Sequence, residues 1–372
     1  MLKSQKLKAE KVFHEKTGIV KPEKLKQGDK VAIVSLSSGM LGEDFCSHNI
    51  EIGLRRLKMF GLEPVFMPNA LKGIDYLRRH PKKRAQDLKT AFLNDDIKGI
   101  ICAIGGDDTY RTLPYLMEDK EFTEAVRSRP KLFTGFSDTT VNHLMFYRLG
   151  MQTFYGPAFI CDLGEIGNEM LPYTKDAFSW YIQEENRMEI SPSQVWYEER
   201  KDFSKAAVGT DRIVHKENHG FELLQGEGKF QGKLLGGCLE SIYDILTSSR
   251  YADEGEICEK YGIFPDEDEW KGKILFIETC EEKPEPELFR KELEALKKEG
   301  VFTAVNGVIV GKPQDEKYYG EYKQIYLDVI DDPKLSVLYN VNFGHALPRT
   351  VLPYGAQAIV DVNEQKIFIN NG

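Results

Sequence analysis

The sequence predicts an α/β protein whose amino-terminal part contains a doubly wound parallel sheet. Short apolar runs such as "KVAIVSLSS" (30–38) and "IKGIICAIGG" (97–106) are typical of strands buried on both faces. Amphipathic stretches with helical spacing separate these runs, and strands that alternate with helices favour a parallel sheet. The chain has 372 residues, of which 41% are hydrophobic, so it is long and apolar enough to form two domains of ordinary size.

In chain order, the amino-terminal pattern alternates five predicted strands with helices. The strands are predicted at 30–38, 63–68, 97–106, 131–137 and 152–157. The helices are predicted at 49–62, 82–96, 111–122 (broken by Pro114) and between Ser137 and Gly150. Small polar residues or glycines follow three of the strands, at 35–38, 105–108 and 135–138. We expect these three loops to meet at the carboxyl edge of the sheet, where open α/β sheets bind ligands.

The pattern changes after about residue 165, where polar residues and glycine become more frequent. We expect an amino-terminal domain over 1–170, a linker or flap over 171–215 and a smaller, β-rich carboxyl-terminal domain over 216–372. Within the last part, further elements are predicted as strands at 272–282, 305–313 and 335–348, helices at 286–300 and 325–333, and a closing hairpin at 357–369 with Asn363 in its turn.

Composition and charge exclude several classes of function. The formal net charge is −9 and no long block of Lys and Arg is present, so a nucleic-acid partner is not expected. No apolar run is long enough for a transmembrane helix, and the first twenty residues lack the apolar core of a signal peptide, which favours the cytoplasm. The six cysteines are scattered and form no C-x-x-C pair, which indicates reduced thiols and neither a disulfide framework nor a zinc site.

The segment Gly135-Phe136-Ser137-Asp138 joins a predicted strand to a helix in very few residues. A nucleophile elbow has this form, because its sharp turn exposes the hydroxyl and aims the next backbone N–H at the developing oxyanion. The full G-x-S-x-G pattern is not met, since Thr139 stands at the second glycine. The alternative is that Ser137 or Asp138 caps the helix.

A second loop, Gly105-Gly106-Asp107-Asp108, also follows a predicted strand. A glycine pair lets the backbone approach a ligand and offers free N–H donors, so this loop is a candidate for half of an oxyanion hole. Two alternatives remain open: a tight turn, or a phosphate site, because "GGDDT" differs by one residue from the Gly-Gly-Asp-Gly-Thr loop of some kinases. The G-x-G-x-x-G and P-loop fingerprints are absent.

A nucleophilic serine requires a base, and the base requires an orienting acid. Among the seven histidines, His345 is distinctive because it ends a predicted apolar strand. Glu278 ends another, within "LFIETCEE", where a carboxylate is costly to desolvate unless it is paired. A histidine N–H is a natural partner. Spacing alone does not establish that Ser137, Glu278 and His345 meet.

In combination and in this order, five motifs resemble the LD-carboxypeptidase family of serine peptidases, which also contains the self-immunity peptidases against microcin C. The motifs are "IGGDDT", "GFSDTTVNHLMFYRLGMQTFYGP", "GKLLGGCLESI", "ILFIETCEE" and "NFGHALPRTVLPYGAQAIVD". The resemblance covers nearly the whole chain.

The resemblance implies a serine-type carboxypeptidase with Ser137 as nucleophile, His345 as general base and Glu278 as orienting acid. Backbone N–H groups of Asp138 and of the loop at Gly106 and Asp107 would form the oxyanion hole. The site would lie between the two domains. Family members are commonly cytoplasmic homodimers that need no metal or other cofactor.

The substrate implied by the resemblance is a small peptide, such as a murein tetrapeptide that loses D-alanine, or a microcin-like aminoacyl-nucleotide amide. Arg111 is a candidate to bind a terminal carboxylate. Trp196 and Phe203 lie in the region where the immunity branch places an aromatic residue on a nucleobase, although either could anchor the linker instead. Phosphotransfer at "GGDDT" and a catalytically silent binding protein remain the alternative functions.

This sequence departs from the family pattern at two places. Cys238 stands in "GGCLESI" where the family usually has Asn. The acid segment "ETCEE" carries additional carboxylates, so Glu281 and Glu282 compete with Glu278 for the role of orienting acid.

Overall fold

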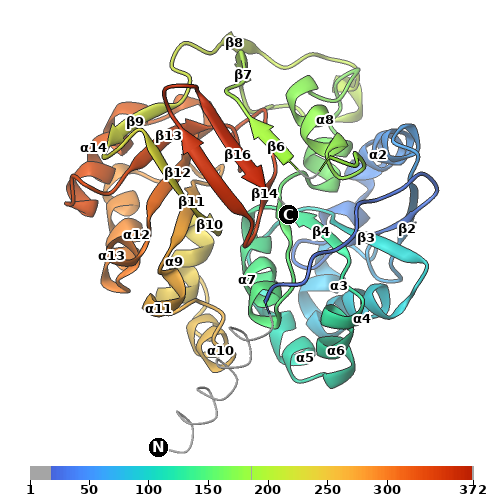
Figure 1. The fold of residues 1–372 in the computed structure, drawn as a ribbon. Helices are drawn as coiled ribbons and strands as arrows, with labels where there is room; N and C mark the ends of the chain where they lie inside the picture. Colours follow the sequence, from blue (N-terminus) through green and yellow to red (C-terminus); the bar gives the residue numbers. More distant parts are fainter. Residues whose placement is uncertain (1–17, 186, 371–372) are drawn as a thin grey trace, which may run out of the picture.

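The computed structural model describes residues 18–185 and 187–370. Most of the segment tested above for a signal peptide, residues 1–17, lies outside them. Two sheets stand side by side, with the amino-terminal half on one side and the carboxyl-terminal half on the other (Figure 1). One large hydrophobic core contains residues from both halves. Within the described ranges, no helix combines the length and apolar character needed to cross a bilayer.

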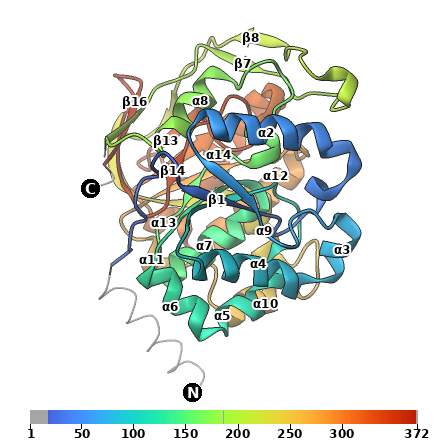
Figure 2. The same cartoon turned by 90° about the vertical axis from the view of Figure 1, so that its right-hand side faces the viewer.

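The first sheet confirms the predicted parallel, doubly wound arrangement. Its strand order is β14-β5-β4-β3-β1-β2, and every pairing is parallel except that of β14 with β5. The strands are β1 (Lys30–Val34), β2 (Glu63–Phe66), β3 (Ile97–Cys102), β4 (Leu132–Gly135), β5 (Phe154–Tyr155) and β14 (Leu352–Pro353). The main helices are α2 (Ser47–Met59), α3 (Ile74–Arg79), α4 (Pro81–Leu93), α6 (Lys120–Ser128) and α7 (Thr140–Leu149). Helix α2 covers one face of the sheet, and α4, α6 and α7 cover the other (Figure 2).

The second sheet is mixed, with the order β6-β16-β15-β10-β11-β12-β13-β9. Its centre is parallel: β10 (Lys229–Cys238), β11 (Lys273–Glu278), β12 (Gly307–Gly311) and β13 (Val337–Val341). Its flanks are antiparallel: β6 (Arg187–Ile190), β9 (Glu222–Gln225), β15 (Gln357–Asp361) and β16 (Lys366–Asn370). Its longer helices are α9 (Leu239–Thr247), α10 (Glu254–Lys260), α12 (Pro286–Lys298) and α14 (Tyr319–Ile330).

Several predicted elements have different limits in the structure. The predicted strand 335–348 ends early, because β13 stops at Val341 and His345 lies in the following loop. Pro114 occupies the first turn of α5 (Leu113–Met117), where its missing N–H is tolerated, so the helix breaks after Met117 and not at the proline. The closing hairpin is confirmed as β15 and β16, with Asn363 in the turn.

Two short strands cross between the halves of the molecule. Strand β6, inside the predicted linker, pairs with β16 of the second sheet, and β14, from the carboxyl-terminal part, pairs with β5 of the first. Strands of two to four residues carry too little periodic pattern to be recognised from sequence. The chain therefore links the two sheets by strand pairing as well as by side-chain packing. The predicted end of the amino-terminal domain at 170 and the predicted end of the linker at 215 stay predictions.

A buried ion cluster holds the middle segment, which contains β7 (Val195–Tyr197) and β8 (Val214–Lys216), against the first half. The carboxylate of Glu165 accepts hydrogen bonds from Arg200 (2.7 Å) and Arg212 (2.5 Å), and all three side chains are at most 7% exposed. Burial raises the pKa of Glu165, but the two arginines outweigh this effect and lower it. The cluster is therefore ionised at neutral pH.

Glu165→Ala leaves two buried guanidinium groups without their carboxylate, so we expect a loss of about 3–5 kcal/mol in the free energy of unfolding. Denaturant titration would measure it, and limited proteolysis should cut within 198–212 in the variant first. Glu198→Ala is the control, because its partly exposed pair with His215 is worth about 1 kcal/mol or less. Equal stability of the two variants would contradict the structural role of the cluster.

Candidate active site

Ser137 occupies a strained turn directly after β4. Its φ is +67°, in the left-handed region that costs a non-glycine residue about 1–3 kcal/mol. The short helix Ser137–Thr139 leads into α7, and neither helix is capped by a side chain, so the capping alternative finds no support. Gly105 lies against the turn, where a Cβ would fall 2.7 Å from the Cβ of Ser137. The serine is therefore presented at the carboxyl edge of the sheet.

The glycine loop lies beside this turn, as the sequence predicts. The carboxylate of Asp138 accepts the backbone N–H of Thr109 at 2.9 Å and thereby ties the two loops together. The N–H of Asp107 donates to Ser37 Oγ at 3.0 Å, so it is already engaged. Gly106 has a φ of +146°. Gly106 and Asp138 are therefore better placed than Asp107 to offer N–H groups to a ligand.

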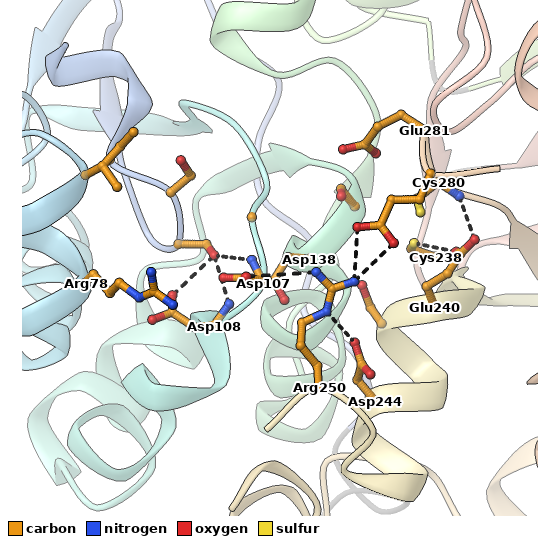
Figure 3. A pocket seen from close by; sticks show the side chains of 18 residues that line it. Arg78, Asp107, Asp108, Asp138, Cys238, Glu240, Asp244, Arg250, Cys280 and Glu281 are labelled. Carbon is orange, nitrogen blue, oxygen red and sulfur yellow. Dashed lines mark hydrogen bonds and ion pairs between the residues drawn. The ribbon is translucent and has the colours of Figure 1, made fainter. Parts of the chain in front are cut away.

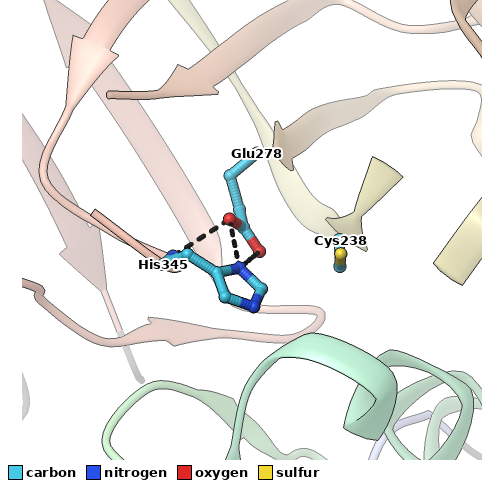
Figure 4. Close-up of side chains that lie close together, drawn as sticks. All are labelled: Cys238, Glu278 and His345. Carbon is cyan, nitrogen blue, oxygen red and sulfur yellow. Dashed lines mark hydrogen bonds and ion pairs between the residues drawn. The ribbon is translucent and has the colours of Figure 1, made fainter. Parts of the chain in front are cut away.

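The structure brings Glu278 and His345 together (Figure 4). Glu278 ends β11, and its Oε2 accepts both the Nδ1–H of His345 (2.8 Å) and its backbone N–H (3.0 Å). Gly344 permits this approach, because its φ is +81° and a Cβ there would lie 2.2 Å from the Glu278 Cδ. Both side chains are buried, so the carboxylate is desolvated but paired.

Tyr155, which the sequence analysis did not single out, connects this pair to Ser137. Its hydroxyl accepts the backbone N–H of Ser137 at 3.0 Å and donates to Glu278 Oε1 at 2.5 Å. Burial raises the pKa of Tyr155 well above its usual value, so the hydroxyl keeps its proton. The only sequence signal was its place at the end of a strand whose neighbour, β4, leads into the turn at Ser137.

The second ring nitrogen of His345 also has an acidic partner. Its Nε2 lies 3.1 Å from Glu281 Oε2. Burial lowers the pKa of His345, but the charge of Glu278 and the hydrogen bonds to Glu278 and Glu281 outweigh burial and raise it to about 10. Of the three acids in "ETCEE", Glu278 orients Nδ1, Glu281 faces Nε2, and Glu282 pairs with Arg250 (3.3 Å).

Two cavities meet at Ser137, and both are lined by residues of the two halves. They share Ser38, Gly106, Ser137 and Glu281. The first, of about 320 Å³, is strongly acidic. Its acidic lining residues are Asp107, Asp108, Asp138, Glu240, Asp244, Glu281 and Glu282, against the arginines Arg78 and Arg250. Figure 3 shows Arg250 extending between Asp107 and Asp244. We name this cavity the acidic compartment.

The second cavity, of about 480 Å³, is more apolar and contains His345. The rings of Phe45 and Phe203 line it and are 58% and 53% exposed. Arg212 and Arg349 also line it, and Arg349 donates to the carbonyl oxygen of His345 at 3.0 Å. We name this cavity the aromatic compartment.

Two predicted binding residues lie elsewhere. Arg111 pairs with Asp253 at 3.2 Å and is not among the residues that line either compartment. Trp196 is 9% exposed and stacks on His215, with ring centroids 4.2 Å apart, so it anchors the middle segment. Phe203 is the member of the predicted aromatic pair that faces a cavity.

Cys238 lies beside the Glu278–His345 pair, and it also lines the acidic compartment. Its sulfur and the ligand atoms of Glu278 and His345 are within 4.8 Å of one another, which makes them the one group in the described ranges with the spacing of a metal site. Burial and the charges of Glu240 and Glu278 raise the pKa of the thiol well above its usual value. A metal ion would therefore have to displace a firmly held proton as well as the bond between Glu278 and His345.

Tyr155→Phe should slow the covalent labelling of Ser137 by a fluorophosphonate. Losing the hydroxyl removes one partner each from Glu278 and Ser137, at a cost of about 1–3 kcal/mol, which corresponds to a slowing of about 5- to 150-fold. Tyr181→Phe is a matched control, because that buried hydroxyl contacts Thr134 at 2.8 Å and not the site. Equal labelling rates in the two variants would contradict a link from Tyr155 to the serine.

Comparisons with known proteins agree with this geometry. The LD-carboxypeptidase N-terminal domain model matches residues 31–156, and the LD-carboxypeptidase C-terminal domain model matches residues 231–360. The crystal structure of an MccF-like protein from Streptococcus pneumoniae in complex with AMP is 51% identical, covers 93% of this chain and 100% of that chain, and has a TM-score of 0.89.

Two curated relatives represent two branches of the family. The microcin C7 self-immunity protein MccF of Escherichia coli is 27% identical over 77% of this chain and 78% of its own length. A probable murein peptide carboxypeptidase of Bacillus subtilis (strain 168) is 27% identical over 95% of each chain. The two domain models and the pneumococcal structure establish that the chain belongs to the LD-carboxypeptidase family, whose members are serine carboxypeptidase hydrolases.

Proposed function

We propose that Ser137, His345 and Glu278 act as a catalytic triad that hydrolyses an amide between an aminoacyl group and a nucleotide. The contact of Glu278 with His345 Nδ1, and the shared lining of Ser137 and His345 in the aromatic compartment, support these roles. We further propose that this site lies between domains spanning 1–170 and 216–372. A cytoplasmic homodimer stays a prediction.

In the proposed mechanism, the Oγ of Ser137 attacks the amide carbonyl carbon while His345 Nε2 takes the hydroxyl proton. The backbone N–H groups of Gly106 and Asp138 stabilise the oxyanion, at about 3 kcal/mol each. His345 then protonates the departing nitrogen as the carbon–nitrogen bond breaks. Water, activated by the same base, hydrolyses the acyl-enzyme, and Glu278 stabilises the imidazolium throughout.

The two compartments beside Ser137 differ in size and in lining residues, and this difference supports the proposed substrate class. The base of a serine hydrolase lies on the leaving-group side, and His345 lines the larger, aromatic compartment. Phe45 and Phe203 there offer ring faces to a nucleobase. Arg212 and Arg349 line the same cavity, but Glu165 and Asp162 already pair with them. The smaller acidic compartment is left for a short acyl group. The AMP in the pneumococcal relative agrees with this division.

A murein tetrapeptide is the second candidate, because the Bacillus subtilis relative matches along 95% of the chain. Phosphotransfer at "GGDDT" is disfavoured, because it gives no role to the contact between Glu278 and His345 beside Ser137.

A substrate comparison tests the proposal. We expect the wild-type enzyme to release the amino acid from an aspartyl phosphoramide of adenosine, and Ser137→Ala to lose at least about 10³-fold of that activity. Mass spectrometry would follow the products, with L-Ala-γ-D-Glu-L-Lys-D-Ala in parallel. Release of D-alanine alone would favour the murein reaction. Equal hydrolysis by wild type and Ser137→Ala would exclude the triad.

Phe203→Ala should raise KM for the nucleotide substrate by about tenfold and leave KM for a nucleotide-free amide nearly unchanged, because base stacking is worth about 1–3 kcal/mol. Phe203→Trp, which keeps a ring face, is the matched control and should retain the wild-type KM. An unchanged KM in Phe203→Ala would show that the ring does not contact the base.

A further inference from the structure

The proposed base is blocked in the substrate-free structure. The Nε2 of His345, which has to accept the proton of Ser137, lies 3.1 Å from Glu281 Oε2. The hydrogen bond from His345 lowers the pKa of Glu281 to about 2, so its carboxylate stays ionised. His345 is therefore held as an imidazolium between two carboxylates, and an imidazolium has no lone pair with which to act as a base.

Glu278 and Glu281 are the groups around His345 that favour its protonated state. The titratable and charged groups that face the ring or its backbone are Glu278 and Glu281 from β11 and its following loop, Tyr155 from β5, Cys238 from β10, and Arg349 from its own segment. Only Glu281 is substantially exposed, at 56% of its side chain. It is the one partner in this set that can move without disturbing the core.

Glu281 also stands where the substrate has to pass. It is one of four residues shared by the two compartments, together with Ser137. A substrate whose carbonyl carbon reaches Ser137 places the atoms next to that carbon beside Glu281. The α-nitrogen of an acyl residue is two bonds from the carbonyl carbon. It is a cation when free and neutral when it is part of a peptide bond.

We propose that Glu281 is a positioning residue that exchanges partners: it pairs with His345 in the free enzyme and with a free α-ammonium group of the acyl residue in the complex. This inference rests on the proposed function and narrows its substrates to unblocked aminoacyl compounds. When the carboxylate moves, the Nε2 proton passes to water. The free lone pair then accepts the Ser137 proton as the bond from Oγ to carbon forms.

The acidic compartment favours this exchange. Its seven acidic residues face only two arginines, and Arg250 is already engaged by Asp244 at 3.4 Å and Glu282 at 3.3 Å. An incoming ammonium group therefore meets an excess of carboxylates, whereas a peptide-bonded nitrogen gains nothing there. When the α-nitrogen of the substrate is blocked, we expect Glu281 to stay paired with His345.

The first test needs no substrate. The rate at which a fluorophosphonate labels Ser137 should rise with pH as His345 loses its proton, and Glu281→Gln should move this rise to lower pH by about one unit. Glu282→Gln removes the charge of the neighbouring carboxylate without touching Nε2, and we expect a clearly smaller displacement. A profile for Glu281→Gln that coincides with wild type, or an equal displacement in both variants, would overturn the inference.

The second test measures selectivity. We expect the wild-type kcat/KM at pH 7 for a free aminoacyl phosphoramide of adenosine to exceed that for its N-acetyl form by about tenfold or more, and Glu281→Gln to reduce the ratio to within about threefold. An unchanged ratio in the variant would overturn the inference while leaving the triad intact. Labelling that persists in Ser137→Ala would instead refute the proposed function itself.

Discussion

The buried carboxylate of Glu278 is the group on which the geometry of the site depends. It lies at the end of a strand in the second sheet and is 1% exposed. Its oxygens accept hydrogen bonds from the hydroxyl of Tyr155, which belongs to the first sheet, and from two N–H groups of His345. A desolvated charge is tolerated only when such donors surround it. The same bonds that offset its desolvation therefore fix the edges of the two sheets against each other.

Close backbone approaches reinforce this constraint. Strand β10 presses against helix α7, because a Cβ on Gly237 would lie 2.4 Å from Thr140, and the N–H of Cys238 donates to the Thr140 hydroxyl at 2.9 Å. Thr140 begins the helix that follows the strained turn at Ser137. Movement of the second sheet relative to the first would thus disturb the turn and the acid together, and the strain at Ser137 persists because its surroundings determine it from several sides.

Much of this arrangement could be predicted, because apolar runs mark buried strands and parallel strands end at a common edge. Those two rules placed Ser137 and the glycine loop near one another, whereas only the family resemblance joined Glu278 and His345 to them. They could not identify Tyr155 or the contact between Glu281 and Nε2, which depend on side-chain direction across two sheets. Nor could they show which of Trp196 and Phe203 faces a cavity. Trp196 is buried and Phe203 is exposed because of the way the middle segment folds. The role expected for Arg111 rested on its place after the glycine loop, and the sequence could not show that Asp253 from the other half pairs with it.

The acidic compartment links charge recognition to proton balance. Burial raises the pKa of Asp138 to about 6. Burial and the charge of Glu278 raise the pKa of Glu240 to about 7. Both carboxyl groups are therefore protonated for part of the time near neutral pH. A cation that enters the compartment favours their ionised forms and therefore releases protons on binding. The negative charge of this compartment is thus not fixed but grows in response to a positive ligand. Glu281, the exposed member of the two acids that keep His345 protonated in the empty site, is for the same electrostatic reason able to pair with a positively charged substrate instead.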